Sequence, residues 1–221
     1  MSFPDVKAII FDYGNVLCEP QPHDDLDAMA YELGLTVDEF MPIYWRDRGP
    51  YDRDEMDAET YWNRVAQRQL PAGRIAKLTD LDSRSWMHPR AATVPWVEAT
   101  SRLGLRTALL SNLPAALRDA LESEAHWLPR FDVRTYSCTI RKTKPSREIY
   151  EHCIGGLGVM PSEIVFLDDR QENIEGAAEL GIHGILFDDP ARVAKELSER
   201  YGLTVSAGAE GDQNGICEGA G

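Results

Sequence analysis

The segment Ala8-Ile9-Ile10-Phe11-Asp12-Tyr13-Gly14-Asn15-Val16-Leu17 decides the fold. Its first four residues are apolar without a break, as expected for a strand that is covered on both faces of a sheet. Asp12 follows this strand directly, and Gly14 lets the chain turn tightly and approach a ligand closely. An Asp after a strand is more often a turn former or a helix cap, so this segment alone does not define a site.

Four more short apolar, β-rich runs are predicted to be strands. They cover residues 107–110, 133–136, 164–167 and 184–187. Helix-like segments separate the later runs, at about 115–122, 146–157 and 171–180. This alternation of strand and helix predicts a parallel α/β sheet.

Polar residues stand at the ends of three predicted strands: Asp12, Ser111-Asn112 and Asp168-Asp169. Ligands of open α/β sheets bind outside the carboxyl ends of the strands, so these residues predict a site. The adjacent Asp168 and Asp169 repel each other unless a cation or hydrogen-bond donors compensate. The pair Asp188-Asp189 also follows a strand, lacks a downstream Asn and is interpreted as a turn. A pair of aspartates alone is therefore weak evidence.

The segment after the first strand has helical periodicity and no convincing strand. Thr36, with Glu39 three residues later, predicts a capping box at a helix start. The last residues hold five glycines and little apolar matter, which is typical of a disordered tail. Three parts are predicted: a core of residues 1–18 and 96–203, a helical cap of residues 19–95, and a disordered tail of residues 204–221.

Composition narrows the possible functions. The chain has 221 residues, and 37 acidic side chains against 23 Lys and Arg give a net charge of -14. An acidic surface repels polyanions, so we expect no nucleic-acid partner. No apolar run approaches the roughly 20 residues that span a bilayer. The four cysteines form no CxxC pair, and the N-terminus does not resemble a signal peptide. We therefore expect a soluble cytoplasmic protein with no membrane partner.

The combination of motifs is more specific than its parts. The order of strand-Asp12, strand-Ser111-Asn112, Lys144-Pro145 and Asp168-Asp169-x-x-x-Asn173 resembles the four motifs of the haloacid dehalogenase (HAD) superfamily. The variant Phe-Asp-x-Gly-Asn-Val-Leu resembles its branch of small bacterial sugar-phosphate phosphatases, such as α-D-glucose-1-phosphate phosphatase. The resemblance implies a Rossmann-like, doubly wound core, a helical cap after the first strand, and a Mg²⁺-dependent hydrolase.

The resemblance also implies roles for individual residues. Asp12 would be the nucleophile and a metal ligand, and the backbone carbonyl of Gly14 would be a second ligand. Asp168 and Asp169 would complete the metal shell, with Asp169 the direct ligand. Asn173 would orient this acidic loop.

The remaining motif residues would bind the substrate. Ser111 and the backbone of Asn112 would hold the phosphoryl oxygens, and Lys144 would neutralise the nucleophile and the phosphate. These residue types fit the chemistry, because a carboxylate nucleophile needs no deprotonation but repels a phosphate dianion. Mg²⁺ prefers oxygen ligands and acts as a Lewis acid. The predicted function is hydrolysis of a small phosphorylated metabolite, such as a sugar phosphate, through an aspartyl-phosphate.

One departure concerns the general acid/base. Most phosphatases of the superfamily have a second Asp two positions after the nucleophile, and here that position is Gly14. A general acid/base is typically worth about 10²–10⁴-fold in rate. Glu19, the cap residue Asp52 and a bound water are the substitutes considered.

Cap residues are expected to set specificity. Arg46 is predicted to bind a phosphate or carboxylate of the substrate, as is Arg48, and Trp45 or Tyr51 to stack on a sugar. In the alternative interpretation, the aromatic residues form the cap core and the arginines pair with surplus acids. Trp86 is interpreted as core or inter-domain packing.

Two other functions remain open from the sequence. A 2-haloacid dehalogenase directs the same aspartate at carbon without a metal, although its first motif resembles Asp-x-Tyr-Gly-Thr and Tyr13 here follows Asp12 directly. A binding or regulatory protein on a degenerate enzyme core is favoured only by Gly14. The oligomeric state is not predicted.

Overall fold

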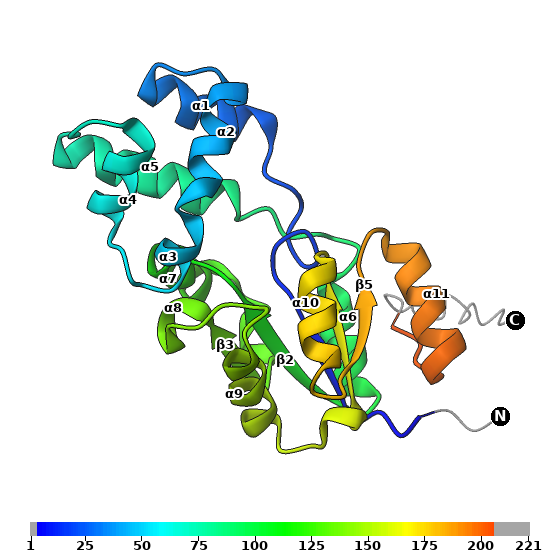
Figure 1. Cartoon of the computed structure of the whole chain (residues 1–221). Coiled ribbons are helices and arrows are strands. Elements are labelled where there is room, and N and C mark those ends of the chain that lie inside the picture. The colour runs from blue at the N-terminus through cyan, green and yellow to red at the C-terminus, as the bar shows by residue number, and fades with distance from the viewer. Residues whose placement is uncertain (1–3, 206–221) are drawn as a thin grey trace, which may run out of the picture.

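The structure is a computed structural model that describes residues 4–205 (Figure 1). The predicted disordered tail, residues 204–221, lies outside the described residues except for Thr204 and Val205.

One five-stranded sheet forms the centre of the molecule, and all of its strands are parallel. Its strands are β1 (Ala8–Phe11), β2 (Arg106–Ser111), β3 (Val133–Tyr136), β4 (Ile164–Asp168) and β5 (His183–Leu186). Their order is β3-β2-β1-β4-β5, so β1 lies between β2 and β4. The three polar strand ends predicted from the sequence therefore meet at one edge of the sheet.

Each face of the sheet is buried under helices because the strands are apolar on both sides. Ile9 and Phe11 of β1 pack into one hydrophobic cluster, and Ala8 and Ile10 pack into another. The first cluster includes residues of α6 (Val94–Arg102), α7 (Ala115–Glu124) and α11 (Pro190–Tyr201). The second includes residues of α9 (Arg147–Leu157) and α10 (Gln171–Ala178). The predicted Rossmann-like α/β fold is confirmed.

Three short helical segments lie next to β3 and β4. They are η1 (Leu128–Arg130), α8 (Ser137–Ile140) and η2 (Pro161–Glu163).

Five helices between β1 and α6 form the cap region, residues 23–85. They are α1 (His23–Leu33), α2 (Val37–Arg46), α3 (Arg48–Asp52), α4 (Ala58–Ala66) and α5 (Ala72–Ser85). The predicted capping box is present, with Thr36 bonded to the backbone of Glu39 and Glu39 bonded to the backbone of Thr36. The cap region buries a hydrophobic cluster of its own, which includes Phe40, Tyr61 and Trp62. We therefore propose that it is a separate domain, which lies within the predicted range of residues 19–95.

Two segments join the cap region to the sheet, and they run side by side. Cys18 and Pro89 form an antiparallel β-bridge. The Glu19 N–H donates to the His88 carbonyl at 2.8 Å, and the Arg90 N–H donates to the Leu17 carbonyl at 2.8 Å. The outgoing and returning linkers are thus hydrogen-bonded to each other.

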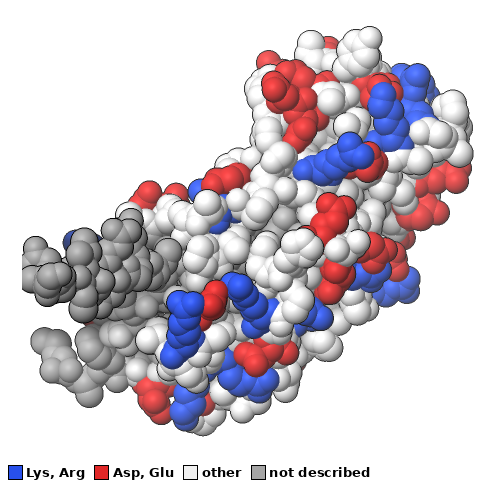
Figure 2. All heavy atoms as spheres, turned by 180° about the vertical axis from the view of Figure 1, so that it is seen from behind, with Lys and Arg blue, Asp and Glu red and all other residues white. Residues whose placement is uncertain are grey.

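The surface carries charges of both signs. Figure 2 shows Lys and Arg interspersed with Asp and Glu on the face opposite to that of Figure 1, and the basic side chains gather into no broad patch on that face. Within residues 4–205, no helix has both the length and the apolar composition needed to cross a membrane.

Candidate active site

Asp12 lies at the carboxyl edge of the sheet, directly after β1. Its N–H donates to the Leu167 carbonyl at 2.9 Å, which continues the pairing of β1 with β4 beyond the last strand residue. The side chain is buried, and its Oδ1 accepts a hydrogen bond from the Tyr13 N–H at 2.7 Å. The pairing of strands therefore fixes the position of this carboxylate.

Lys144 joins two strands of the sheet through their carboxylates. Its Nζ lies 2.7 Å from Asp12 Oδ1 and 2.6 Å from Asp168 Oδ2. The Asn112 side chain holds the loop, because its Oδ1 accepts from the Lys144 N–H at 2.8 Å and its Nδ2 donates to the Lys144 carbonyl at 3.0 Å. Burial alone would lower the pKa of Lys144, but the two carboxylates outweigh burial and raise it.

Asp168, the last residue of β4, and Asp169, which follows it, have different surroundings. Asp168 is fully buried, and its Oδ1 accepts from Asn173 Nδ2 at 2.8 Å and from the Arg170 N–H at 2.9 Å. Asp169 is partly exposed, and its Oδ2 accepts from Asn15 Nδ2 at 2.7 Å. Asn15 has a positive φ of 57°, a conformation that Asn tolerates better than most residues. This turn therefore links the first motif to the last.

Asp12, Asp168 and Asp169 form a group suited to a divalent cation. One carboxylate oxygen from each lies within 4.8 Å of the others. Burial, opposed by Lys144, raises the pKa of Asp12 to about 8. Three carboxylates against one ammonium leave a surplus of negative charge, and hard oxygen donors are what Mg²⁺ prefers. The donor set therefore fits the cation that the sequence resemblance implies.

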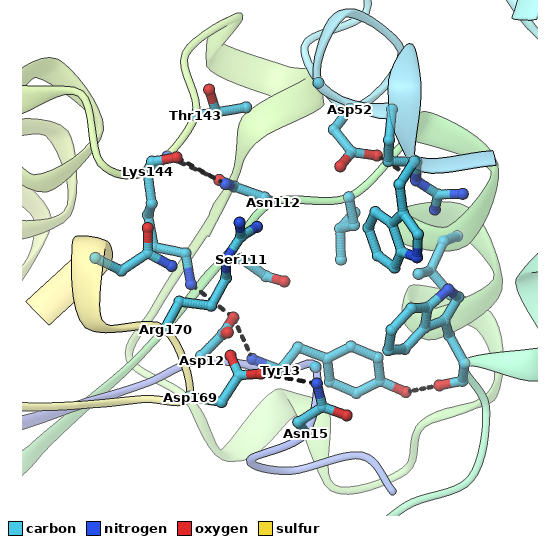
Figure 3. Close-up of a pocket in the computed structure, with 18 of the residues that line it drawn as sticks. Asp12, Tyr13, Asn15, Asp52, Ser111, Asn112, Thr143, Lys144, Asp169 and Arg170 are labelled. Carbon is cyan, nitrogen blue, oxygen red and sulfur yellow. Dashed lines mark hydrogen bonds and ion pairs between the residues drawn. The ribbon is translucent and has the colours of Figure 1, made fainter. Parts of the chain in front are cut away.

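A cavity of about 560 Å³ opens above this group, between the sheet edge and the cap region (Figure 3). Six of the predicted site residues line it: Asp12, Gly14, Ser111, Asn112, Lys144 and Asp169. Asp168 lies behind them, fully buried against Lys144. The cap region contributes Trp45, Arg48, Gly49 and Asp52 to the lining.

Arg46 is the predicted site residue that the structure does not bring to the cavity. Its Nε lies 3.2 Å from Asp47 Oδ2, and its other contact is the Arg64 carbonyl at 3.3 Å. Arg46 ends α2 and Arg48 begins α3, and of the two only Arg48 lines the cavity. Tyr51 is buried, with its ring 4.3 Å from that of Tyr61 between centroids. Arg46 and Tyr51 thus lie where the alternative interpretation places them: Arg46 pairs with an acid, and Tyr51 packs in the cap core.

Several residues that line the cavity were not identified from the sequence, among them Asn15, Trp86 and Arg170. Asn15 stands within the first motif, but its contact with Asp169 spans 154 positions. Trp86 was interpreted as packing, and it reaches the cavity because the returning linker lies against Tyr13, whose hydroxyl donates to the Trp86 carbonyl. Arg170 directly follows the acidic pair, and this adjacency was the one available signal.

The chain is similar to a known family and to known proteins. The family model for haloacid dehalogenase-like hydrolases matches residues 6–181. Mouse acyl-CoA dehydrogenase family member 10 is 30% identical over 91% of this chain, which spans 20% of that protein's length. A sesquiterpene phosphatase from Aspergillus oryzae is 25% identical, over 89% of this chain and 97% of its own length.

Solved structures share the fold. A predicted HAD-like hydrolase from Porphyromonas gingivalis matches with a TM-score of 0.70 at 21% identity, covering 88% of this chain and 97% of its own. A HAD family enzyme from Bacteroides thetaiotaomicron, solved with magnesium and inorganic phosphate, matches with a TM-score of 0.66 at 16% identity, covering 85% of this chain and 98% of its own.

Proposed function

Because the chain belongs to the haloacid dehalogenase-like hydrolases, we propose that it is a Mg²⁺-dependent phosphatase of small phosphorylated metabolites, such as sugar phosphates. One observation carries the proposal. Asp12, Asp168 and Asp169 bring carboxylate oxygens within 4.8 Å of one another, and Lys144 bridges the first two. A nucleophile, an ammonium and a cation site thus converge beside one cavity.

Two proteins similar to this chain support phosphoryl transfer. The Aspergillus oryzae relative, matched along nearly its whole length, is a sesquiterpene phosphatase. The Bacteroides thetaiotaomicron structure holds magnesium and inorganic phosphate on the same fold. Their names support a phosphatase that uses a divalent cation, whereas the identity of the substrate rests on the cavity.

The cation site would be formed by Asp12, the Gly14 carbonyl and Asp169, with Asp168 behind them. When bound, Mg²⁺ supplies Lewis-acid stabilisation of the charge that develops on the phosphoryl group. Asn15 holds Asp169 through its amide, and Asn173 holds Asp168, so the ligands are oriented before the ion binds.

The chain's own residues carry the transfer. The Asp12 carboxylate attacks phosphorus, and the bond from phosphorus to the leaving-group oxygen breaks. Lys144 offsets the charge of Asp12 and of the phosphate. Ser111 and the backbone N–H of Asn112 would hold the phosphoryl oxygens, because the Asn112 side chain is already bonded to the Lys144 backbone. Water then hydrolyses the aspartyl-phosphate and restores Asp12.

The cavity suits the organic part of a small ester. A volume of about 560 Å³ lies within the usual range for small-molecule sites. Trp45 and Trp86 line it with their ring centroids 6.3 Å apart, and Leu113 and Leu117 line it as well. This lining offers flat apolar surface on which a sugar ring or another organic group can pack.

A cytoplasmic location is part of the same proposal. Cys18, Cys138 and Cys153 are buried and unpaired, as is usual for proteins of a reducing compartment.

The test is a screen of phosphorylated metabolites with Mg²⁺, with Asp12→Asn as the inactive variant. Asp188→Asn is the matched control, because Asp188 also follows a strand but is exposed and pairs with Arg192. We expect phosphate release by the wild type and the control, and none by Asp12→Asn. Equal release by all three proteins would refute the function, and halide release from 2-chloropropionate in EDTA would indicate a dehalogenase instead.

A further inference from the structure

The position two residues after the nucleophile cannot supply an acid, because it is Gly14. A Cβ atom built there would lie 3.5 Å from Cζ3 of Trp86, so an indole ring borders this place. An alkoxide leaving group nevertheless needs a proton, and the cavity must provide it from another element.

Four carboxylates line the cavity: Asp12, Asp52, Asp169 and Glu172. Asp12 and Asp169 belong to the proposed nucleophile and cation site. Glu172 is about half exposed and lies 2.5 Å from Arg170 in an ion pair. Glu19, considered from the sequence, is not among the lining residues and pairs with Arg90 at 2.9 Å. Asp52 is therefore the remaining carboxylate on the cavity wall.

The surroundings of Asp52 suit a group that exchanges protons. It ends α3, is 7% exposed, and its Oδ1 accepts from Arg48 Nε at 2.9 Å. Arg48 is shared, because its Nη1 also lies 2.9 Å from Asp82 Oδ2. Burial, with the charge of Asp82 and against that of Arg48, raises the pKa of Asp52 to about 6. Such a carboxyl is poised between its two protonation states near neutral pH.

Asp52 is also held in place relative to the sheet. Its backbone carbonyl accepts from Ser137 Oγ at 2.6 Å, and that hydroxyl oxygen accepts from the Leu113 N–H at 2.9 Å. Leu113 is two residues beyond Ser111, where the phosphoryl group is proposed to bind. Figure 3 shows Asp52 on the cap side of the cavity, across from Asp12 and Asp169. The leaving group of a phosphoryl group attached to Asp12 would lie between the two sides.

We propose that Asp52 is the general acid/base of the proposed phosphatase and takes the place of the carboxylate that is missing at Gly14. In the first step the bond from Asp12 Oδ to phosphorus forms, and the electron pair of the broken P–O bond goes to the leaving oxygen. That oxygen takes the proton of the Asp52 carboxyl. In the second step the Asp52 carboxylate takes a proton from the water that attacks phosphorus, which frees Asp12 and inorganic phosphate.

The test compares two esters in the wild type and in Asp52→Asn, which keeps an oxygen acceptor for Arg48. 4-Nitrophenyl phosphate has a leaving group that is stable as an anion, whereas phenethyl phosphate needs protonation. We expect kcat/KM for the phenethyl ester to fall by about 100-fold or more, and kcat/KM for the nitrophenyl ester to stay close to that of the wild type. A burst of nitrophenolate should appear in the variant, because loss of the base slows the second step.

Glu172→Gln is the matched control, because Glu172 also lines the cavity but pairs with Arg170 and has no hydrogen bond or ion pair with Arg48 or Asp52. We expect this control to change kcat/KM for both esters by the same factor. Equal losses for both esters in Asp52→Asn would refute the role of Asp52 and leave the phosphatase intact. Failure of the wild type to release phosphate from any ester would instead refute the proposed function, on which this role rests.

A second measurement needs no variant. Across a series of esters, a wild-type enzyme with a working acid shows a kcat/KM that depends weakly on leaving-group acidity. A steep rise with acidity would overturn the proposal even if Asp52→Asn failed to fold.

Discussion

The two aspartate pairs of this chain, Asp168-Asp169 and Asp188-Asp189, follow neighbouring parallel strands and have opposite fates. The first pair follows β4, an inner strand beside β1, and meets Asp12 and Lys144. The second follows β5 at the edge of the sheet, where Asp189 accepts from the Arg192 N–H at the start of α11. The same dipeptide thus belongs to the proposed cation site or caps a helix, depending on the neighbouring strand.

Electrostatics separates the pairs in the same way. Burial, with the charge of Asp168 and against the Asn15 hydrogen bond, raises the pKa of Asp169. The hydrogen bond from Arg192 lowers the pKa of Asp188. A buried carboxyl with a raised pKa is typical of a functional site, whereas an exposed carboxylate paired with Arg192 is typical of a structural role.

The largest expected effect that distinguishes the pairs is on activity. Asp169→Asn should lower Mg²⁺-dependent phosphate release by about 1000-fold, because a bound cation supplies several kcal/mol of transition-state stabilisation. Asp188→Asn should leave release unchanged, since that side chain lies on the surface beside Arg192. Steady-state assays with one active ester measure both. Similar losses in the two variants would show that the pairs do not differ as proposed.

The next effect is on stability in the presence of the cation. Mg²⁺ at about 100 times its dissociation constant should raise the free energy of unfolding of the wild type by about 2.7 kcal/mol. Asp169→Asn should lose most of this gain, and Asp188→Asn should keep it. Urea denaturation with Mg²⁺ or with EDTA measures the gain without any substrate. A full gain in Asp169→Asn would remove Asp169 from the site.

A smaller effect, on stability in the absence of the cation, should be greater for the second pair than for the first. Asp189→Ala removes the side-chain cap of α11 and should lower the free energy of unfolding by about 1 kcal/mol. Asp169→Ala removes no cap, because α10 has no side-chain hydrogen bond at its N-cap residue, Arg170. Urea midpoints in EDTA compare the two variants. A greater loss in Asp169→Ala would contradict the assignment of capping to the second pair alone.

The smallest effect depends on pH. Because Arg192 lowers the pKa of Asp188 in the folded chain, the stability that this pair contributes is present above the unfolded pKa, about 4. This stability is lost as the pH falls through the lower pKa that Asp188 has in the folded chain. Wild type and Asp188→Asn should therefore differ slightly in unfolding temperature at pH 7 and converge well below pH 4. A difference that grows in acid would contradict the direction of this shift.

The sequence was sufficient for the sheet and for the residues at its edge. Continuous apolar runs such as Ile164–Leu167 predicted buried strands, and parallel strands necessarily bring their carboxyl ends together. The order of Asp12, Ser111, Lys144 and Asp168-Asp169 then predicted which side chains would meet, because each is fixed to a strand end or to the loop beside it.

The cap side of the cavity was harder to predict. Arg46 and Arg48 have the same chemistry in the sequence, and the short helix α3 alone decides that Arg48 lines the cavity. Trp86 reaches the cavity through a linker that has no periodicity of its own. Asp52 was one of several acids, and its contacts with Arg48 and Ser137 come from tertiary packing.

The paired linkers also limit how the cap region moves. Hydrogen bonds between Glu19 and His88 and between Leu17 and Arg90 make a two-stranded connection between the cap region and the sheet. The Asp52 carbonyl is also bonded to Ser137 on the sheet side, so the cap region is tied to the sheet at the cavity as well as at its linkers.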